Sequence, residues 1–318
     1  MAIKLERVES LSRDLIEEVS RAIVGKEAVL ERVVLAILSD GHILIEDFPG
    51  LGKTIMAKSF AAALGCEFKR VQFTPDLLPA DITGTYIFNR QKDDFQLRRG
   101  PVFTNVLLAD EINRAPPKTQ AALLEAMQER QATLEGETHP IDRPFLVMAT
   151  QNPIEFEGTY PLPEAQIDRF IMRIEMGYPS PGAEKEMLSR RVARKRDFVD
   201  IEKVAGPRQV LAMQAAVEEV FVEEDLEQYI VEVVRGTRNH PRTAVGASPR
   251  GALALLQLSR SKAAMKGRDY VLPDDIKEIV GDALAHRLIL KPDPLIRGVK
   301  PSTILLDVLQ EVPVPKVD

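Results

Sequence analysis

Short apolar runs alternate with amphipathic stretches over the first 178 residues of the chain. The runs have the length of strands and lack polar alternation, which is typical of strands buried on both faces of a sheet. We predict such strands at residues 42–46, 106–109, 145–149 and 171–176, with a further candidate at 68–73. Helical spacing of apolar residues predicts helices within 5–39, 53–64 and 118–130. Strands that alternate with helices favour a parallel α/β layer.

Two polar segments interrupt this alternation, at residues 79–99 and 131–143. Their turn-like sequences predict hairpins inserted into the α/β core. The composition changes around residues 178–182, which form the best candidate for a linker, and the patterns beyond it are helical. Helices are predicted at 210–220, 226–237, 249–266 and 273–288. We therefore expect two domains, 1–178 and 179–318.

The composition is that of a globular protein of 318 residues, long enough for two domains. Its formal charge of −6 and sequence pI near 5.5 argue against a protein that mainly coats nucleic acid or an anionic membrane. A single cysteine, Cys66, excludes an internal disulfide and favours a reducing compartment. The first residues lack the apolar stretch of a signal peptide, and no apolar run is long enough to span a membrane. We expect a cytoplasmic protein.

The segment Phe48-Pro-Gly-Leu-Gly-Lys-Thr54 lies between a predicted buried strand and a predicted helix. That context is typical of a P-loop, in which glycines let backbone N–H groups surround phosphates. Lys53 would reach the β- and γ-phosphates, and the Thr54 hydroxyl would hold Mg²⁺. Asp47 occupies the usual first glycine position, and aspartate tolerates turn conformations better than most residues. The alternative is an ordinary glycine turn before a helix.

A pair of carboxylates, Asp110 and Glu111, follows the apolar run at 106–109. Asp110 would hold Mg²⁺ through water, and Glu111 would polarise the attacking water. The alternative for Glu111 is a capping position in the loop that follows. Together with the predicted P-loop, the pair favours metal-assisted hydrolysis of a phosphoanhydride.

Several longer motifs resemble the MoxR family of AAA+ ATPases. They are IVGKE at 23–27, ADEINRAPPKTQAALLEAMQE at 109–129, ATQNP at 149–153, GTYPLPEAQIDRF at 158–170 and GASPRGAL at 246–253. The resemblance implies the α/β fold class, with a P-loop AAA+ parallel-sheet nucleotide domain and a smaller all-helical lid domain. It also implies a homo-oligomeric ring, usually hexameric, with ATP and Mg²⁺ bound between subunits.

The same resemblance assigns site residues. ATP would be held by Val24, Gly25, Pro49, Gly50, Leu51, Gly52, Lys53, Thr54, Ile55 and Asp110, and the metal by Thr54 and Asp110. The catalytic set it implies is Glu111, Asn152 as sensor 1, Arg169 as the arginine finger and Arg250 as sensor 2.

Sequence context supports these last roles unequally. Asn152 follows a buried strand, although it could instead cap a turn before Pro153. Arg169 requires a neighbouring subunit, and its alternative is a local ion pair with Asp168 or Glu164. Arg250 lies in the first turn of a predicted helix, where a cation opposes the helix dipole, so a functional role is favoured. Whether Arg250 acts in its own subunit or on the neighbour stays open, with the resemblance favouring the neighbour.

The resemblance implies a chaperone-like ATPase that remodels partner complexes, typically proteins with von Willebrand factor A domains. One alternative is a magnesium-chelatase-like or nucleic-acid-acting motor subunit. Neither predicted insertion is convincingly basic, because Arg143 is balanced by Glu135, Glu137 and Asp142, and the basic residues of 79–99 lie beside Asp93 and Asp94. We therefore expect no nucleic acid partner. The other alternative is a nucleotide-dependent scaffold with little turnover.

Overall fold

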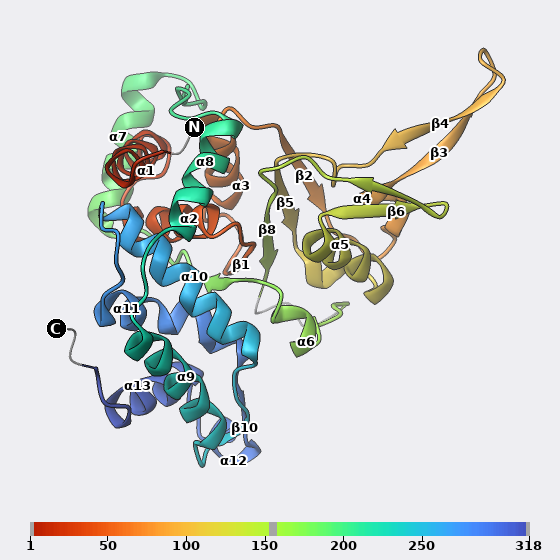
Figure 1. The fold of residues 1–318 in the computed structure, drawn as a ribbon. Helices are drawn as coiled ribbons and strands as arrows, with labels where there is room; N and C mark the ends of the chain where they lie inside the picture. Colours follow the sequence, from red (N-terminus) through yellow and green to blue (C-terminus); the bar gives the residue numbers. More distant parts are fainter. Residues whose placement is uncertain (1–2, 153–157, 316–318) are drawn as a thin grey trace.

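A computed structural model describes residues 3–152 and 158–315. Its centre is a five-stranded parallel sheet with the strand order β2-β5-β8-β1-β9 (Figure 1). The strands are β1 (Ile43–Glu46), β2 (Phe68–Gln72), β5 (Val106–Asp110), β8 (Leu146–Gln151) and β9 (Met172–Ile174). All five predicted strands are therefore present, with ends shifted by one to two residues. Because the strands are parallel, their carboxyl ends share one edge of the sheet and their amino ends share the other, here called the carboxyl edge and the amino edge.

Helices cover both faces of the sheet, so its strands are buried on both sides. Within β1, Ile43 and Ile45 join the cluster formed with α1 (Leu5–Ser20), α2 (Glu27–Leu38) and α3 (Lys53–Ala63). Leu44 joins the opposite cluster, with Leu123 and Leu124 of α5 (Pro117–Glu129). Alternate side chains of one strand thus enter two cores. The pattern predicted for residues 42–46 is confirmed.

The two insertions are hairpins. The first begins with a short helix, α4 (Pro79–Thr83), followed by antiparallel β3 (Gly84–Asn89) and β4 (Asp94–Arg99), which extend away from the body (Figure 1). The second pairs β6 (Gln131–Leu134) with β7 (Glu137–Pro140). The helical turn at 79–83 is a correction to the hairpin predicted for all of 79–99. It forms because Pro79 presets helical φ at the first position and the Asp81 carboxylate accepts from the Leu78 N–H at 2.9 Å.

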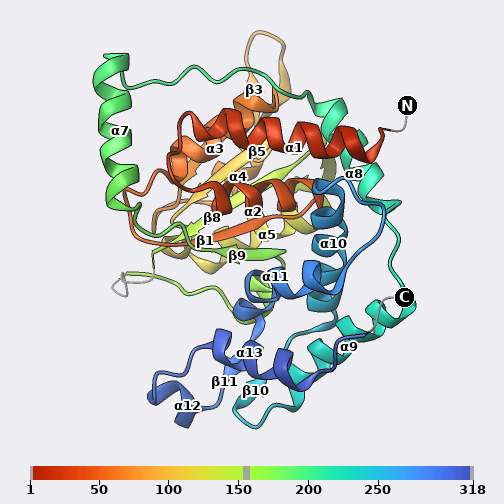
Figure 2. The same cartoon turned by 90° about the vertical axis from the view of Figure 1, so that its left-hand side faces the viewer.

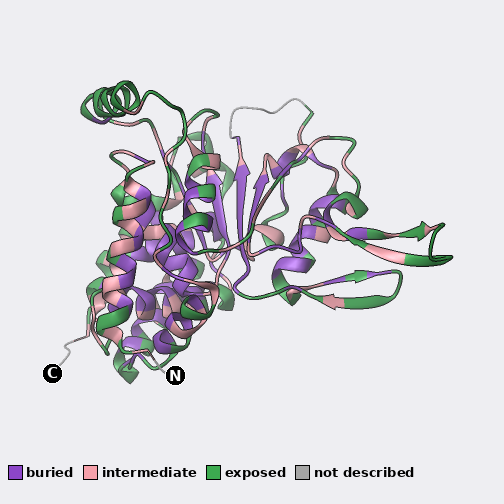
Figure 3. Cartoon of the chain, turned by 90° about the horizontal axis from the view of Figure 1, so that it is seen from above, coloured by how far each residue is buried: buried purple, intermediate pink, exposed green. Residues whose placement is uncertain are grey.

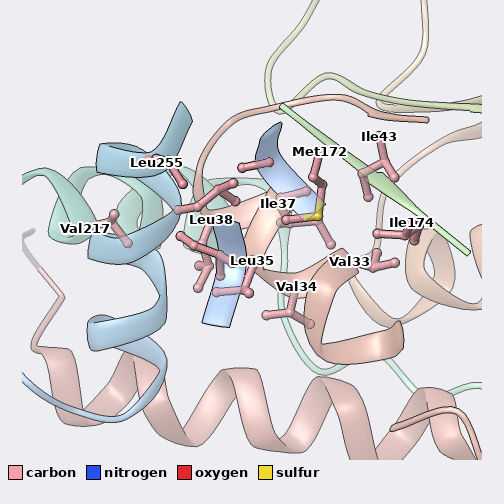
Figure 4. Packing of buried hydrophobic residues seen from close by; sticks show 14 of the residues in the cluster. Val33, Val34, Leu35, Ile37, Leu38, Ile43, Met172, Ile174, Val217 and Leu255 are labelled. Carbon is pink, nitrogen blue, oxygen red and sulfur yellow. The ribbon is translucent and has the colours of Figure 1, made fainter. Parts of the chain in front are cut away.

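The C-terminal part is a helical lid, packed on α1 and α2. Its helices are α7 (Pro181–Arg194), α8 (Pro207–Glu218), α9 (Glu224–Asn239), α10 (Pro249–Met265), α11 (Pro273–Leu284), α12 (Pro292–Ile296) and α13 (Pro301–Glu311). Figure 4 shows how α2 is enclosed, with Val33 and Ile37 near strand residues and Leu38 near Val217 and Leu255 of the lid. The lid and the first face of the sheet therefore share one continuous core.

Two sequence-based expectations for this part are wrong. The region is not purely helical, because β10 (Thr243–Val245) pairs with β11 (Ile289–Leu290). The helix predicted to run to residue 288 ends at Leu284, since Ala285–Arg287 form a 3₁₀ turn that leads into β11. The linker expected at 178–182 also contains the start of α7, where the Ser180 hydroxyl caps the helix and Pro181 takes its first position.

Three short elements complete the fold: the 3₁₀ turn η1 (Ile112–Arg114), α6 (Glu164–Ile167) and the 3₁₀ turn η2 (Ala285–Arg287). In the described ranges no helix is long and apolar enough to cross a membrane.

Candidate functional site

The loop between β1 and α3 has the backbone of a phosphate-binding turn. Gly50 and Gly52 have φ of +82° and +89°, a left-handed conformation that favours glycine. A Cβ on Gly50 would meet nothing within 4 Å, so conformation rather than space requires glycine there. Gly52 is the N-cap of α3 and offers no side chain, which leaves the first N–H groups of the helix for a ligand. The loop can therefore bind an anion.

Lys53 and Asp47 fix the two ends of this loop. The Lys53 ammonium donates to the Asp47 carbonyl at 2.6 Å. Burial lowers the pKa of Lys53, and the carboxylates of Asp47, Asp110 and Glu111 oppose that effect. The Asp47 carboxylate accepts from the N–H groups of Phe48 at 2.8 Å and Gly177 at 2.6 Å. Asp47 has no positive φ, so the position needs no glycine, and its side chain ties the loop to the chain after β9.

Asp110 is the last residue of β5 at the carboxyl edge, and Glu111 follows it. Asp110 Oδ1 accepts from the Thr150 hydroxyl at 2.7 Å, and Oδ2 accepts from Arg70 Nη2 at 2.7 Å. Glu111 Oε2 accepts from Gln72 Nε2 at 2.7 Å and Arg114 Nη1 at 2.9 Å. Each carboxylate is thus oriented by named donors.

The backbone of Glu111 is left-handed, with φ 56° and ψ 51°. That conformation costs a non-glycine residue about 1–3 kcal/mol. The Glu111 N–H is held by the Thr150 hydroxyl at 2.9 Å, which supports the turn. Strain of this kind is typical of positions where a side chain must point in a set direction.

Arg70, Gln72 and Thr150 were missed by the sequence analysis. Arg70 and Gln72 are two residues apart on β2 and so share a face, and Gln72 lies in register with Asp110. The signal in the sequence was two polar residues, Arg70 and Gln72, on the same face at the end of a predicted strand. It points to the site only when β2 is known to be the neighbour of β5.

These residues line one cleft of about 380 Å³, here called the phosphate cleft. Its lining includes the predicted Pro49, Gly50, Leu51, Gly52, Lys53, Thr54, Ile55, Asp110, Glu111 and Asn152. Pro153, the last residue of the ATQNP motif, lies outside the described residues. The cleft combines backbone donors, an ammonium and two carboxylates, a set that suits a polyphosphate with its metal.

The donor set suits Mg²⁺ in particular. The described residues hold no cluster of three or more His, Cys, Asp or Glu side chains for a metal. Mg²⁺ is usually held by one or two protein ligands together with phosphate oxygens and water. The Thr54 hydroxyl and the Asp110 carboxylate, both in the lining of the phosphate cleft, supply such a pair.

Val24 and Gly25 do not line the phosphate cleft but belong to the turn beside it. A Cβ on Gly52 would lie 3.7 Å from Ile23 Cδ1, so this turn packs against the phosphate loop. Gly25 has φ +70°, and a Cβ there would lie 2.6 Å from the Ala183 Cβ of α7. Only glycine fits this close approach.

Arg169 and Arg250 lie elsewhere, at the amino edge. Together with Arg130 and Arg287 they line a second cleft of about 360 Å³, here called the arginine cleft, whose lining includes Gly41 and His42 before β1. Arg169 Nη1 donates to the Leu124 carbonyl at 2.8 Å, and its Nε is buried without a partner in the described residues. Neither Asp168 nor Glu164 pairs with Arg169, so the local ion pair left open by the sequence is absent among the described residues.

Arg250 Nη1 lies 3.8 Å from Asp168 Oδ2, a carboxylate that also binds Ser248 and Arg287. Five residue steps of extended chain separate His42, in the arginine cleft, from Asp47, in the phosphate cleft. At ~3.3 Å per residue this is about 16 Å, beyond the length of an arginine side chain. In Figure 3 the arrowheads of the central sheet point to one side, the carboxyl edge. The arginine cleft includes Gly41 and His42, which precede β1 at the opposite edge.

Comparison with known proteins agrees with this architecture. A family profile described as "ATPase family associated with various cellular activities (AAA)" matches residues 42–172, and an "AAA lid domain" profile matches residues 235–308. Protein YeaC of Bacillus subtilis is 44% identical over 94% of this chain and 93% of its own length. Chaperone MoxR1 of Mycobacterium tuberculosis is 45% identical over 98% of this chain and 84% of its own length.

A crystal structure of a protein from Cytophaga hutchinsonii matches with a TM-score of 0.92 and 41% identity, covering 98% of this chain and 97% of that one. Both the AAA domain and the lid are thus matched along nearly the whole chain. The chain belongs to the MoxR-type family of AAA ATPases.

Proposed function

We propose that copies of this chain assemble head-to-tail into a ring, of six subunits as the family resemblance implies. ATP is hydrolysed where the phosphate cleft of one copy meets the arginine cleft of the next. The observation that carries the proposal is the placement of the two clefts at opposite edges of one sheet. A heterologous contact brings such edges together, and rings result when the rotation closes.

Within the phosphate cleft, the N–H groups of Gly50 to Thr54 and the Lys53 ammonium bind the phosphates, and the turn at Val24 and Gly25 receives the adenine. Thr54 and Asp110 would hold Mg²⁺, which supplies positive charge to the β- and γ-phosphates. Pro49, Leu51 and Ile55 shape the walls of the cleft. These assignments are supported by the left-handed glycines and by the position of α3.

Glu111 accepts a proton from the attacking water, and Asn152 orients that water. The neighbour's Arg169 and Arg250 stabilise the negative charge that develops on the phosphates. Support comes from Arg169, which has a buried Nε without a partner and no carboxylate contact among the described residues.

The free energy of ATP hydrolysis drives the remodelling of partner protein complexes in the cytoplasm. One relative carries the name Chaperone MoxR1, which supports a chaperone-like role for this chain. We propose partners with von Willebrand factor A domains and a client complex that they connect to the ring. The single cysteine, Cys66, supports a reducing compartment.

The test measures ATPase rate against protein concentration for the wild type and Arg169→Ala, with mass photometry of the same samples. We expect the specific activity of the wild type to rise as rings form. Arg169→Ala should still assemble and lose about 10³-fold or more in rate, the scale of an arginine finger. Arg235→Ala, which removes an exposed arginine of α9 outside both clefts, is the matched control. Activity that is flat with concentration and indifferent to Arg169 overturns the proposal.

A further inference from the structure

Helix α7 contacts its own chain along one narrow face and leaves most of its surface exposed. Ala183 is its one buried residue, whereas Leu188 and Val192 are 62% and 74% exposed. Figure 2 shows α7 set apart from the rest of the molecule. A helix of 14 residues is marginal in water by itself, and most helical stability comes from packing an amphipathic face. Something outside the chain is therefore expected to cover it.

The outward face of α7 is fixed by its contacts with the body. Ala183 packs against Gly25, and Arg190 donates to the Ser20 carbonyl at 3.1 Å. These two residues are seven apart and share the inner face. Leu188 and Val192 lie on the opposite face, and Lys185, seven residues before Val192, shares it. The outward face is thus an apolar ridge with a basic residue at its end.

A groove with the complementary chemistry lies near the N-terminus. It has a volume of about 830 Å³, and its apolar lining includes Ile3 together with Ala212 and Ala215 of α8. Its charged lining is three carboxylates, Glu6, Glu219 and Asp269, and one ammonium, Lys4, so acidic groups prevail. In residues 3–152 and 158–315 no side-chain hydrogen bond or ion pair engages the three carboxylates. Alanines allow the close approach of a helix. The groove suits a basic amphipathic helix.

The ridge and the groove face opposite sides of the molecule. Helix α7 stands beside the phosphate loop at the carboxyl edge, because one turn contacts both. In this turn Gly25 packs against Ala183 of α7, and Ile23 lies beside Gly52 of the loop. Figure 2 places α7 on one side of the molecule, and α8 with the start of α1 on the other. The groove therefore lies on the side of the amino edge, as does the arginine cleft. A head-to-tail contact that joins the two clefts brings α7 of one copy toward the groove of the next.

We propose that the Lys185–Leu188–Val192 face of α7 docks in the groove of the adjacent copy, with the two aliphatic side chains on the alanines of α8 and the lysine facing the carboxylates. This inference rests on the proposed function, because it assumes the same head-to-tail ring. It adds a second contact to that interface, one that involves neither nucleotide nor the arginines.

Cysteine cross-linking in the full-length protein tests the contact. In a Cys66→Ser background, the reduced Val192→Cys and Ala215→Cys proteins are exposed to an oxidant each alone and as a mixture. We expect a covalent dimer only in the mixture, and a ladder of higher species when one chain carries both changes. Ile296→Cys, at a side chain 83% exposed on α12, replaces Val192→Cys as the control and should give no cross-link with Ala215→Cys.

A second variant measures the contribution of the ridge to assembly. Leu188→Asp with Val192→Asp should raise the protein concentration at which rings form by about tenfold or more, because two aliphatic side chains lose their burial. Ile296→Asp should leave that concentration unchanged. Rings that form normally in the double variant, with no cross-link in the mixture and activity still dependent on Arg169, overturn the docking of α7 alone. Absence of rings in the wild type overturns the proposed function as well.

Discussion

The phosphate cleft and the arginine cleft differ in how they are built. The first is formed mostly by two continuous stretches at the carboxyl edge, 47–55 after β1 and 110–111 at the end of β5, and β8 lies between these two strands. The second collects side chains from α5, the chain before β9, α10 and η2 at the amino edge. The first has a backbone shaped for an anion, and the second has four arginines beside two aspartates, Asp40 and Asp168. The comparison teaches that the anion-binding backbone and the arginine cluster lie at opposite edges of the sheet, so that one copy cannot join them by itself.

The electrostatics of the two clefts differ in the same way. In the phosphate cleft Arg70 is paired with Asp110, and Lys53 lies near three carboxylates. In the arginine cleft Asp40 pairs with Arg130, and Asp168 pairs with Arg287. Arg169 contacts only a carbonyl in the described ranges, and Arg250 is 3.8 Å from a carboxylate already bound by two other groups. Among the four arginines of the arginine cleft, Arg169 and Arg250 are therefore the two least neutralised by carboxylates of the described residues.

Beside Arg169→Ala, the largest effect is expected from Glu111→Gln, which tests the phosphate cleft alone. Removal of a general base typically lowers the rate by about 10²–10⁴-fold. The amide still accepts a hydrogen bond in the same place, so ATP binding should persist and ATP should accumulate on the protein. Single-turnover hydrolysis and the binding of a fluorescent ATP analogue measure the two quantities. Unchanged turnover would remove Glu111 from its role and favour a nucleotide-dependent scaffold.

The contrast between the clefts also explains what the sequence could predict. The phosphate loop was predictable because the residues that bind phosphate are contiguous and glycine encodes their local conformation. Arg70 and Thr150 were not, because they meet Asp110 only through the strand order β2-β5-β8. Arg287 was predicted to lie inside a helix, whereas the 3₁₀ turn brings it to the chain before β9. Sequence patterns predict strands and helices well here, but not which of them become neighbours.

A smaller effect, on stability, is expected at the arginine cleft. Arg287 is 3% exposed and donates to Asp168 Oδ1 at 2.8 Å and to the Phe170 carbonyl at 2.8 Å, which holds the segment that carries Arg169. Burial lowers the pKa of Arg287, and the bond to Asp168 opposes that effect. Breaking a buried pair by removing one partner costs about 3–5 kcal/mol. We expect a loss of this size in the free energy of unfolding of Arg287→Met, measured in urea.

The exposed Arg235→Met is the matched control for Arg287→Met and should change the free energy of unfolding by less than about 0.5 kcal/mol. Asp168→Asn with Arg287→Met completes a double-mutant cycle. Additive losses in that cycle would show that the two side chains do not stabilise each other, and that the arginine cleft is held by packing alone.

His42 links the amino edge to α5 and belongs to the same cleft. Its Nδ1 accepts from the Val147 N–H at 3.0 Å, so Nε2 carries the ring proton and donates to the Met127 carbonyl at 3.0 Å. Both bonds require the neutral ring, because a proton on Nδ1 would remove the acceptor for Val147. Burial is the main cause that lowers the pKa of His42 to about 4, and the nearby Arg130 adds to it.

The smallest effect is therefore expected from pH. The unfolded chain binds a proton at His42 near the ordinary pKa of 6.5, whereas the folded chain does so only near 4. The neutral His42 ring contributes fully to the free energy of unfolding above pH 6.5. This contribution is lost as the pH falls to about 4, which lowers the free energy of unfolding by ~3 kcal/mol. Urea unfolding at several pH values, for the wild type and His42→Gln, measures the difference between them. Carboxylates titrate in both proteins, so only the difference between the wild type and His42→Gln reports on the histidine. If the free energies of unfolding of the two proteins fall in parallel with pH, the loss of stability is not due to His42.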